Sequence, residues 1–231
     1  MQARPSPRNF ILFDLDGTLI DGVDDLVAAM NVVLRDQAQP AIDRPALEPL
    51  LGDGMSVLTR RVFAQRGVQL EGATLQARTL DYLNAYKDTS YRHTRLFDGV
   101  VETLQGLKAA GWIIGLASNK LTEPCRQILE RLQILELFDV VAGGDATSVR
   151  KPDAGHLVHA LEALGYDAAR GDRAVMVGDH SNDIVAARGC GAQAIAVAFE
   201  TDPTRANSLQ ADAVLTDFRS LPDALERLSA Q

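Results

Sequence analysis

Pairs of aspartates follow two short apolar runs of the sequence. Asp14 and Asp16 come after the run FILF, and Asp179 comes after AVMVG, with Asp183 four residues later. Carboxylates within several Å of one another repel and take up protons unless a cation joins them. Oxygen ligands favour Mg²⁺ over zinc, and Mg²⁺ is usually held by one or two carboxylates, water and a substrate phosphate. Brought together by the fold, these four residues predict a Mg²⁺ site.

Groups that suit phosphate follow other apolar runs. Ser118 and Asn119 come after the run WIIGLA, Lys151 lies shortly after FDVVAG, and Gly17 lies in the turn after FILF. An ammonium, a hydroxyl donor and the backbone N–H groups of a turn are suited to holding phosphate oxygens. The residue types therefore indicate a small phosphorylated ligand beside the cation.

Other metal and phosphate motifs do not fit. An EF-hand loop beginning at Asp14 needs Gly at its sixth position and Glu at its twelfth, where the sequence has Leu19 and Asp25. No Gly-Lys-Ser/Thr triplet is present, which excludes a P-loop. The segment Gly52-Asp53-Gly54 continues to Val57 instead of a third glycine, which excludes a dinucleotide fingerprint.

Five apolar runs of strand length must position these groups. Segments of helical period separate the last four runs, which is typical of a parallel sheet with helices on both faces. We expect an α/β, Rossmann-like sheet whose strands end at one edge, where functional groups gather in open α/β sheets. The expected strands are residues 10–14, 112–118, 138–143, 174–179 and 194–199.

Boundary residues mark three helices between these strands. Asp98 is expected to cap a helix that ends at Gly111. Thr122 with Pro124 begins the next, and Asp153 begins one that ends at Gly165.

The segment after the first strand interrupts this alternation. Between residues 21 and 95 we expect helices at 23–35, 55–65 and 73–87 and no strand. A connection between strand and helix normally needs only a few residues, so the segment predicts an inserted all-helical domain. The expected core then comprises residues 1–20 and 96–231, and the helical cap comprises residues 21–95.

Composition limits the partners and the compartment. The 231 residues carry a net charge of −8, which argues against a nucleic-acid partner. No apolar run approaches the roughly 18 residues that span a bilayer, and the start MQARPSPRN indicates a frayed tail without a secretory signal. Cys125 and Cys190 form no CxxC pair, which favours a reducing compartment, here the cytoplasm.

Taken together, the motifs resemble a known family. DLDGTL at residues 14–19, SN at 118–119, KP at 151–152 and GDHSND at 178–183 are similar, in order and spacing, to the four motifs of the haloacid dehalogenase superfamily of phosphatases. The similarity to bacterial phosphoglycolate phosphatase-like members extends from Phe10 to about Phe199. It includes the helical insertion, GDGM at 52–55, LFDGVVETLQGLKAAG at 96–111, SNK at 118–120 and FDVVAGGD at 138–145.

The resemblance implies a role for each motif residue. Asp14 would be the nucleophile that forms an aspartyl-phosphate, and Asp16 would be the general acid and base. Ser118, Asn119 and Lys151 would bind the phosphoryl group. Mg²⁺ would be held by the Asp14 carboxylate, the Asp16 carbonyl and Asp179, with Asp183 close by. Gly52, Asp53 and Gly54 would be the cap loop that closes over the substrate, or else an ordinary turn between two helices.

Several positions depart from the family pattern. His180 stands where Ser or Thr is common, and Leu121 stands where phosphoglycolate phosphatases often have Pro. AVAFET at 196–201 replaces an expected Gly-rich stretch. The other histidines, His93 and the pair His156 and His159, are expected on the surface, the pair on a solvated helix face.

The favoured function is a Mg²⁺-dependent phosphomonoesterase for a small metabolite, with 2-phosphoglycolate the first substrate to consider. One alternative is a phosphosugar mutase of the β-phosphoglucomutase type, and another is a phosphoaspartate signalling module. Dehalogenase activity is disfavoured because it needs neither Asp16 as acid and base nor a metal. Both monomer and homodimer remain open.

Overall fold

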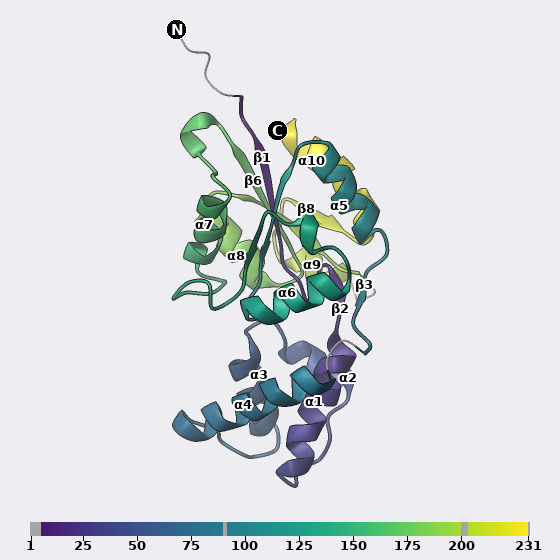
Figure 1. Cartoon of the computed structure of the whole chain (residues 1–231), viewed down its shortest axis with the longest axis vertical. Helices are drawn as coiled ribbons and strands as arrows, with labels where there is room; N and C mark the ends of the chain where they lie inside the picture. The colour runs from purple at the N-terminus through teal and green to yellow at the C-terminus, as the bar shows by residue number, and fades with distance from the viewer. Residues whose placement is uncertain (1–5, 90–91, 200–202, 231) are drawn as a thin grey trace. The chain divides into compact units, whose positions relative to one another are not determined.

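The chain folds into two compact units. The computed structural model describes residues 6–89, 92–199 and 203–230 (Figure 1). One unit comprises residues 1–20 with 96–231, and the other comprises residues 21–95. Where the chain passes between units, β2 (Ile20–Asp21) and β3 (Arg95–Leu96) pair as a two-stranded sheet.

The larger unit contains the expected parallel sheet. Its six strands lie in the order β5-β4-β1-β6-β7-β8, and each neighbouring pair is parallel. Near the centre, Phe10 of β1 lies opposite Ile113 of β4 and Ala174 of β6. The strands are β1 (Asn9–Phe13), β4 (Ile113–Ala117), β5 (Val140–Ala142), β6 (Arg173–Gly178), β7 (Gln193–Val197) and β8 (Ala213–Leu215).

Helices cover both faces of this sheet. Figure 1 shows α7 and α8 on one side and α5 and α10 on the other. On the first side, Leu12 and Met176 of the sheet belong to one buried cluster with Leu157 of α7 and Ile184 of α8. The helices of this unit are α5 (Val100–Ala109), α6 (Thr122–Arg131), α7 (Ala154–Ala163), α8 (Ser181–Gly189), α9 (Pro203–Ser208) and α10 (Leu221–Ser229), with 3₁₀ turns at Leu135–Leu137, Ala168–Arg170 and Phe218–Ser220.

The smaller unit has its own core and is helical except at its two ends, where Asp21 and Arg95 belong to strands that the sequence did not predict. Leu26 and Met30 pack with Phe63 and Tyr82 in a buried apolar cluster. Its helices are α1 (Val23–Asp36), α2 (Arg44–Leu47), α3 (Met55–Ala64) and α4 (Gly72–Thr89), with a 3₁₀ turn at Glu48–Leu50. The alternation between strand and helix therefore resumes only after this unit.

The structure corrects one expected helix start and part of the expected tail. The residue that precedes α5 is Gly99, with φ of 84°, and the Asp98 side chain does not cap the helix. Only the end of the expected tail is described: Arg8 donates from its backbone N–H and its guanidinium to Asp172. Residues 1–5 lie outside the described part.

No helix among the described residues is both long enough and apolar enough to cross a membrane.

Candidate active site

The first strand positions Asp14 at the carboxyl edge of the sheet. The backbone N–H of Asp14 donates to the carbonyl of Val177 at 2.9 Å, so the residue is held beside the end of β6. A tight turn follows, in which the N–H groups of Leu19 and Ile20 donate to the carbonyl of Leu15. This turn reverses the chain and leaves Asp14 facing the ends of the neighbouring strands.

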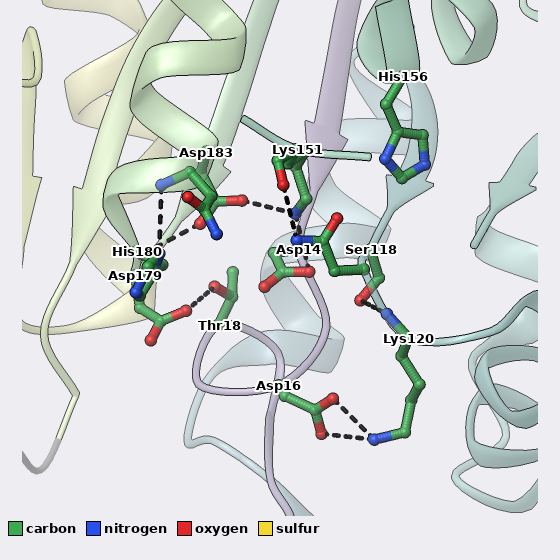
Figure 2. A network of polar contacts seen from close by, with 12 residues as sticks. Asp14, Asp16, Thr18, Ser118, Lys120, Lys151, His156, Asp179, His180 and Asp183 are labelled. Carbon is green, nitrogen blue, oxygen red and sulfur yellow. Dashed lines mark hydrogen bonds and ion pairs between the residues drawn. The ribbon is translucent and has the colours of Figure 1, made fainter. Parts of the chain in front are cut away.

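Three of the four predicted carboxylates and one lysine lie together at this edge. One oxygen each from Asp14, Asp179 and Asp183 lie within 4.8 Å of one another. The Lys151 ammonium lies 3.0 Å from Asp14 Oδ1 and 2.5 Å from Asp183 Oδ1. Figure 2 shows Lys151 directed toward these two carboxylates. The Lys151 and Asp183 side chains are only 2% and 1% exposed, so this pair is held almost without water.

Two glycines make this close arrangement possible. A Cβ at Gly178 would lie 2.3 Å from the Asp183 carboxyl carbon, and a Cβ at Gly17 would lie 2.5 Å from Asp179 Oδ2. Gly17 also has φ of 79°, which residues with a side chain rarely adopt. Glycine at these positions lets the carboxylates approach the backbone of β6 and of the turn.

Burial and mutual repulsion shift the pKa values of this group. Burial and the nearby charges of Asp14 and Asp183 raise the pKa of Asp179 well above its usual range. Burial raises the pKa of Asp183 to about 6, although the charge of Lys151 opposes the shift. The pKa of Lys151 is raised because Asp14 and Asp183 outweigh the effect of burial. Carboxylates held at such a cost could bind a hard cation, which would relieve the repulsion.

The loop after β4 brings Ser118 and Asn119 to the same edge. Ser118 is buried, and its Oγ accepts a hydrogen bond from the backbone N–H of Lys120 at 3.3 Å. Asn119 donates from its side-chain amide to the carbonyl of Lys151 at 2.9 Å. Asn119 therefore ties the loop after β4 to the segment that carries Lys151.

The Asp16 carboxylate does not join the other three. It contacts the Lys120 ammonium, at 2.7 Å and 3.1 Å from its two oxygens. In Figure 2 this carboxylate points toward Lys120 and away from Asp14. The expectation of one group of four carboxylates is wrong in this respect, because a lysine on the neighbouring strand end provides a separate partner.

Two residues that the motifs contained have contacts not foreseen from their types. The Thr18 hydroxyl donates to Asp179 Oδ1 at 3.3 Å. His180 caps α8, because its Nδ1 accepts from the N–H of Asn182 while Asp183 Oδ2 accepts from the N–H of His180. His180 thus supplies the acceptor that Ser or Thr provides at this helix position.

His156 is not on a solvated face, which corrects the expectation from its spacing. Its side chain is fully buried, and Nε2 lies 3.3 Å from the carbonyl of Ala142. Burial, with the charge of Lys151, lowers the pKa of His156. His159 is exposed, as expected. The apolar neighbours Leu157 and Leu161 define the buried face of α7, and His156 lies on its edge.

The segment Gly52, Asp53 and Gly54 precedes α3 in the helical unit. Gly52 and Gly54 have φ of 107° and 85°, so the segment forms a turn that needs glycine. The Arg61 guanidinium lies 2.6 Å from the Asp53 carboxylate and donates to the carbonyl of Leu50. Arg61, nearly two turns into α3, therefore stabilises this turn. The segment 196–201 after β7 differs from the family pattern, and its last two residues, Glu200 and Thr201, lie outside the described residues.

Comparison with known proteins agrees with the motifs and the fold. The family model "Haloacid dehalogenase-like hydrolase" matches residues 11–197. The phosphoglycolate phosphatase of Caulobacter vibrioides is 34% identical over 93% of this chain and 89% of its own, and that of Agrobacterium fabrum is 34% identical over 97% and 95%. A crystal structure of a predicted phosphoglycolate phosphatase from Haemophilus somnus is 26% identical, covers 94% of this chain and 97% of its own, and superposes with a TM-score of 0.85. These matches confirm the resemblance seen in the motifs, and the chain belongs to the haloacid dehalogenase-like hydrolases.

Proposed function

We propose that this protein is a Mg²⁺-dependent phosphomonoester hydrolase that acts on a small organic phosphate, with 2-phosphoglycolate as the first substrate to test. The observation that carries the proposal is the contact of Asp14 with Lys151 beside Asp179 and Asp183. A carboxylate nucleophile, a cation site and an ammonium at one sheet edge are the parts that phosphoryl transfer needs. The relatives from Caulobacter vibrioides and Agrobacterium fabrum are phosphoglycolate phosphatases, which supports the choice of first substrate.

In the proposed reaction, an Asp14 carboxylate oxygen attacks phosphorus, and the bond from phosphorus to the alkoxide oxygen breaks. Asp16 gives a proton to the leaving alkoxide and later takes one from the water that hydrolyses the aspartyl-phosphate. Ser118 and Lys151 hold the phosphoryl oxygens, and Asn119 orients the segment of Lys151 through its carbonyl. The products are an alcohol and inorganic phosphate.

The donor set fits Mg²⁺. Asp14, Asp179 and Asp183 supply carboxylate oxygens, and the raised pKa of Asp179, caused by burial and by the charges of Asp14 and Asp183, supports a cation at this group. We propose that these residues, together with the backbone carbonyl of Asp16, hold the ion. When bound, Mg²⁺ would offset the negative charge that gathers around the transferred phosphoryl group.

The helical unit, residues 21–95, is proposed to act as a cap that excludes water while the alcohol leaves. Its turn at Gly52, Asp53 and Gly54 is proposed to approach the substrate. We further propose that the protein works in the cytoplasm, as a monomer or a homodimer.

The decisive experiment is phosphate release from 2-phosphoglycolate with saturating Mg²⁺ and, in parallel, with EDTA. Release that EDTA abolishes is expected, and Asp14→Asn should abolish it too because the nucleophile is lost. Full turnover by Asp14→Asn would reject the mechanism. Isomerisation of a sugar phosphate without net release would instead identify a mutase, and a phosphorylated Asp14 that persists for minutes would identify a signalling module.

A further inference from the structure

The proposed function assigns no role to Lys120, which forms an ion pair with Asp16 at the site. The Lys120 ammonium contacts both oxygens of the Asp16 carboxylate, at 2.7 Å and 3.1 Å. The Lys120 side chain is 6% exposed, while that of Asp16 is 29% exposed. The lysine is therefore enclosed by protein, and the carboxylate lies at the open side of the pair.

Lys120 is held firmly enough to orient a partner. Its carbonyl accepts from the N–H of Gly144 at 2.7 Å, and its own N–H donates to Ser118 Oγ at 3.3 Å. A lysine side chain normally carries large rotamer freedom, which burial of its stem removes. The ammonium is thus a fixed charge at the end of β4.

The backbone of Asp16 is fixed independently of its side chain. Asp16 forms a β-bridge with Ile20, inside the turn that follows β1. Its carboxylate is not among the three that lie within 4.8 Å of one another. The contact with Lys120 is therefore what sets the direction of the Asp16 side chain (Figure 2).

We propose that Lys120 is the positioning residue of Asp16, as Lys151 is the partner of Asp14. This inference rests on the proposed function, in which Asp16 exchanges protons with the leaving alkoxide and the water. A general acid or base works only when its oxygen lies within hydrogen-bond reach of the reacting group. Lys120 restricts Asp16 to a narrow set of orientations and so acts on the reaction through Asp16.

A double-mutant cycle tests this inference with K120M, D16N and the two combined, assayed for phosphate release from 2-phosphoglycolate. K120M keeps the length of the side chain and removes its charge. We expect kcat to fall about 10- to 100-fold, the loss typical of a misplaced catalytic group, with KM changed less than about twofold. In the D16N background K120M should cost less than about twofold, because residues that act as a unit are not additive.

Three further variants make the result specific. K120R should recover most of kcat, since a guanidinium also contacts two carboxylate oxygens. K108M is the matched control, because Lys108 contacts both oxygens of Asp139 at 2.8 Å and 2.9 Å on the exposed surface, and it should leave kcat unchanged. If K120M does not fold, as judged by its melting temperature, K120Q repeats the cycle.

The outcomes separate the two claims. A K120M cost that is as large in D16N as in the wild type, or a change confined to KM, would overturn the positioning role and leave the phosphatase proposal intact. Turnover by D16N at the wild-type rate would reject the acid and base role itself, and with it this inference.

Discussion

At the residue scale, Gly178 makes space for a carboxylate. A Cβ at this position would lie 2.3 Å from the Asp183 carboxyl carbon, so Gly178→Ala must displace Asp183 from Lys151. We expect kcat to fall about tenfold or more, because Asp183 is proposed to hold Mg²⁺ and small displacements within an active site are costly. The Mg²⁺ concentration for half-maximal activity should rise, and a titration of activity against Mg²⁺ measures both effects.

Gly106→Ala is the matched control for this change. Gly106 lies inside α5, and a Cβ there would have no atom within 4 Å apart from its chain neighbours and the backbone of the helix itself. Alanine there should raise the free energy of unfolding by about 0.5–1 kcal/mol and leave kcat alone. Equal kcat values for Gly178→Ala and the wild type would contradict the packing argument.

His156 gives a second prediction at this scale, on pH. Burial lowers its pKa in the folded protein, whereas the unfolded chain has a pKa of about 6.5. As the pH falls, the unfolded chain takes up a proton at His156 before the folded protein does, which favours unfolding. The contribution of the neutral His156 to the free energy of unfolding is therefore complete above pH about 6.5 and is lost as the pH falls through the folded pKa. Denaturant unfolding between pH 7 and 5 should show a shallower pH dependence for His156→Asn than for the wild type. The exposed His159 provides the control, since His159→Asn should keep the wild-type slope.

At the element scale, α7 begins at a true cap and α5 does not. The Asp153 carboxylate accepts from the N–H of Gly155 at 2.8 Å, whereas Asp98 is 91% exposed and caps nothing. We expect Asp153→Ala to lower the free energy of unfolding by about 1 kcal/mol and Asp98→Ala to change it by less than about 0.5 kcal/mol. Equal effects of the two substitutions in denaturant titrations would show that the capping geometry is wrong.

The sequence alone predicted the long strands well, but it could not predict short strands or helix caps. Long apolar runs predicted the central strands β1, β4, β6 and β7 to within one or two residues, because buried parallel strands need continuous apolar sequence. The strand β8 was missed, since its three residues Ala213–Leu215 give too short a signal. Asp98 and Asp153 have the same residue type before a helix, and only the backbone conformation at Gly99 distinguishes them.

The sequence predicted which residues meet at the sheet edge, but it did not predict the partner of Asp16. Asp14, Asp179, Asp183 and Lys151 meet because each follows the carboxyl end of a strand, which the order of motifs implies. The partner of Asp16 could not be predicted, because its contact depends on the direction of a side chain from another strand end. Lys120 is part of the SNK segment, but a lysine in the sequence can be either a buried partner of a carboxylate or a charge on the surface.

At the scale of the whole molecule, the clustered carboxylates of the proposed cation site are expected to lower the stability of the metal-free protein. The larger unit places four aspartates and two lysines at one edge, with a formal charge of −2 when all six are ionised. The raised pKa of Asp179 means that, without metal, the folded protein holds its proton at a higher pH than the unfolded chain does. For such a group the free energy of unfolding falls as the pH rises from about 3.9 through the folded pKa. Metal-free protein should therefore be destabilised at pH 8 by its own site.

Asp179→Asn separates the destabilisation caused by the ionised carboxylate from the stabilisation by bound Mg²⁺, and both are measured as changes in melting temperature. The amide cannot ionise, so at pH 8 with EDTA the variant should melt above the wild type, and its melting temperature should depend less on pH. A ligand that binds only the folded state stabilises it by about 2.7 kcal/mol at a hundred times its dissociation constant, so Mg²⁺ should raise the melting temperature of the wild type markedly. The variant should gain little from Mg²⁺, because one of three clustered carboxylates is gone.

Asp98→Asn, on the exposed surface, should match the wild type in both conditions. A variant that melts below the wild type in EDTA and gains as much from Mg²⁺ would show that Asp179 is an ordinary stabilising carboxylate and that the ion, if bound, lies elsewhere.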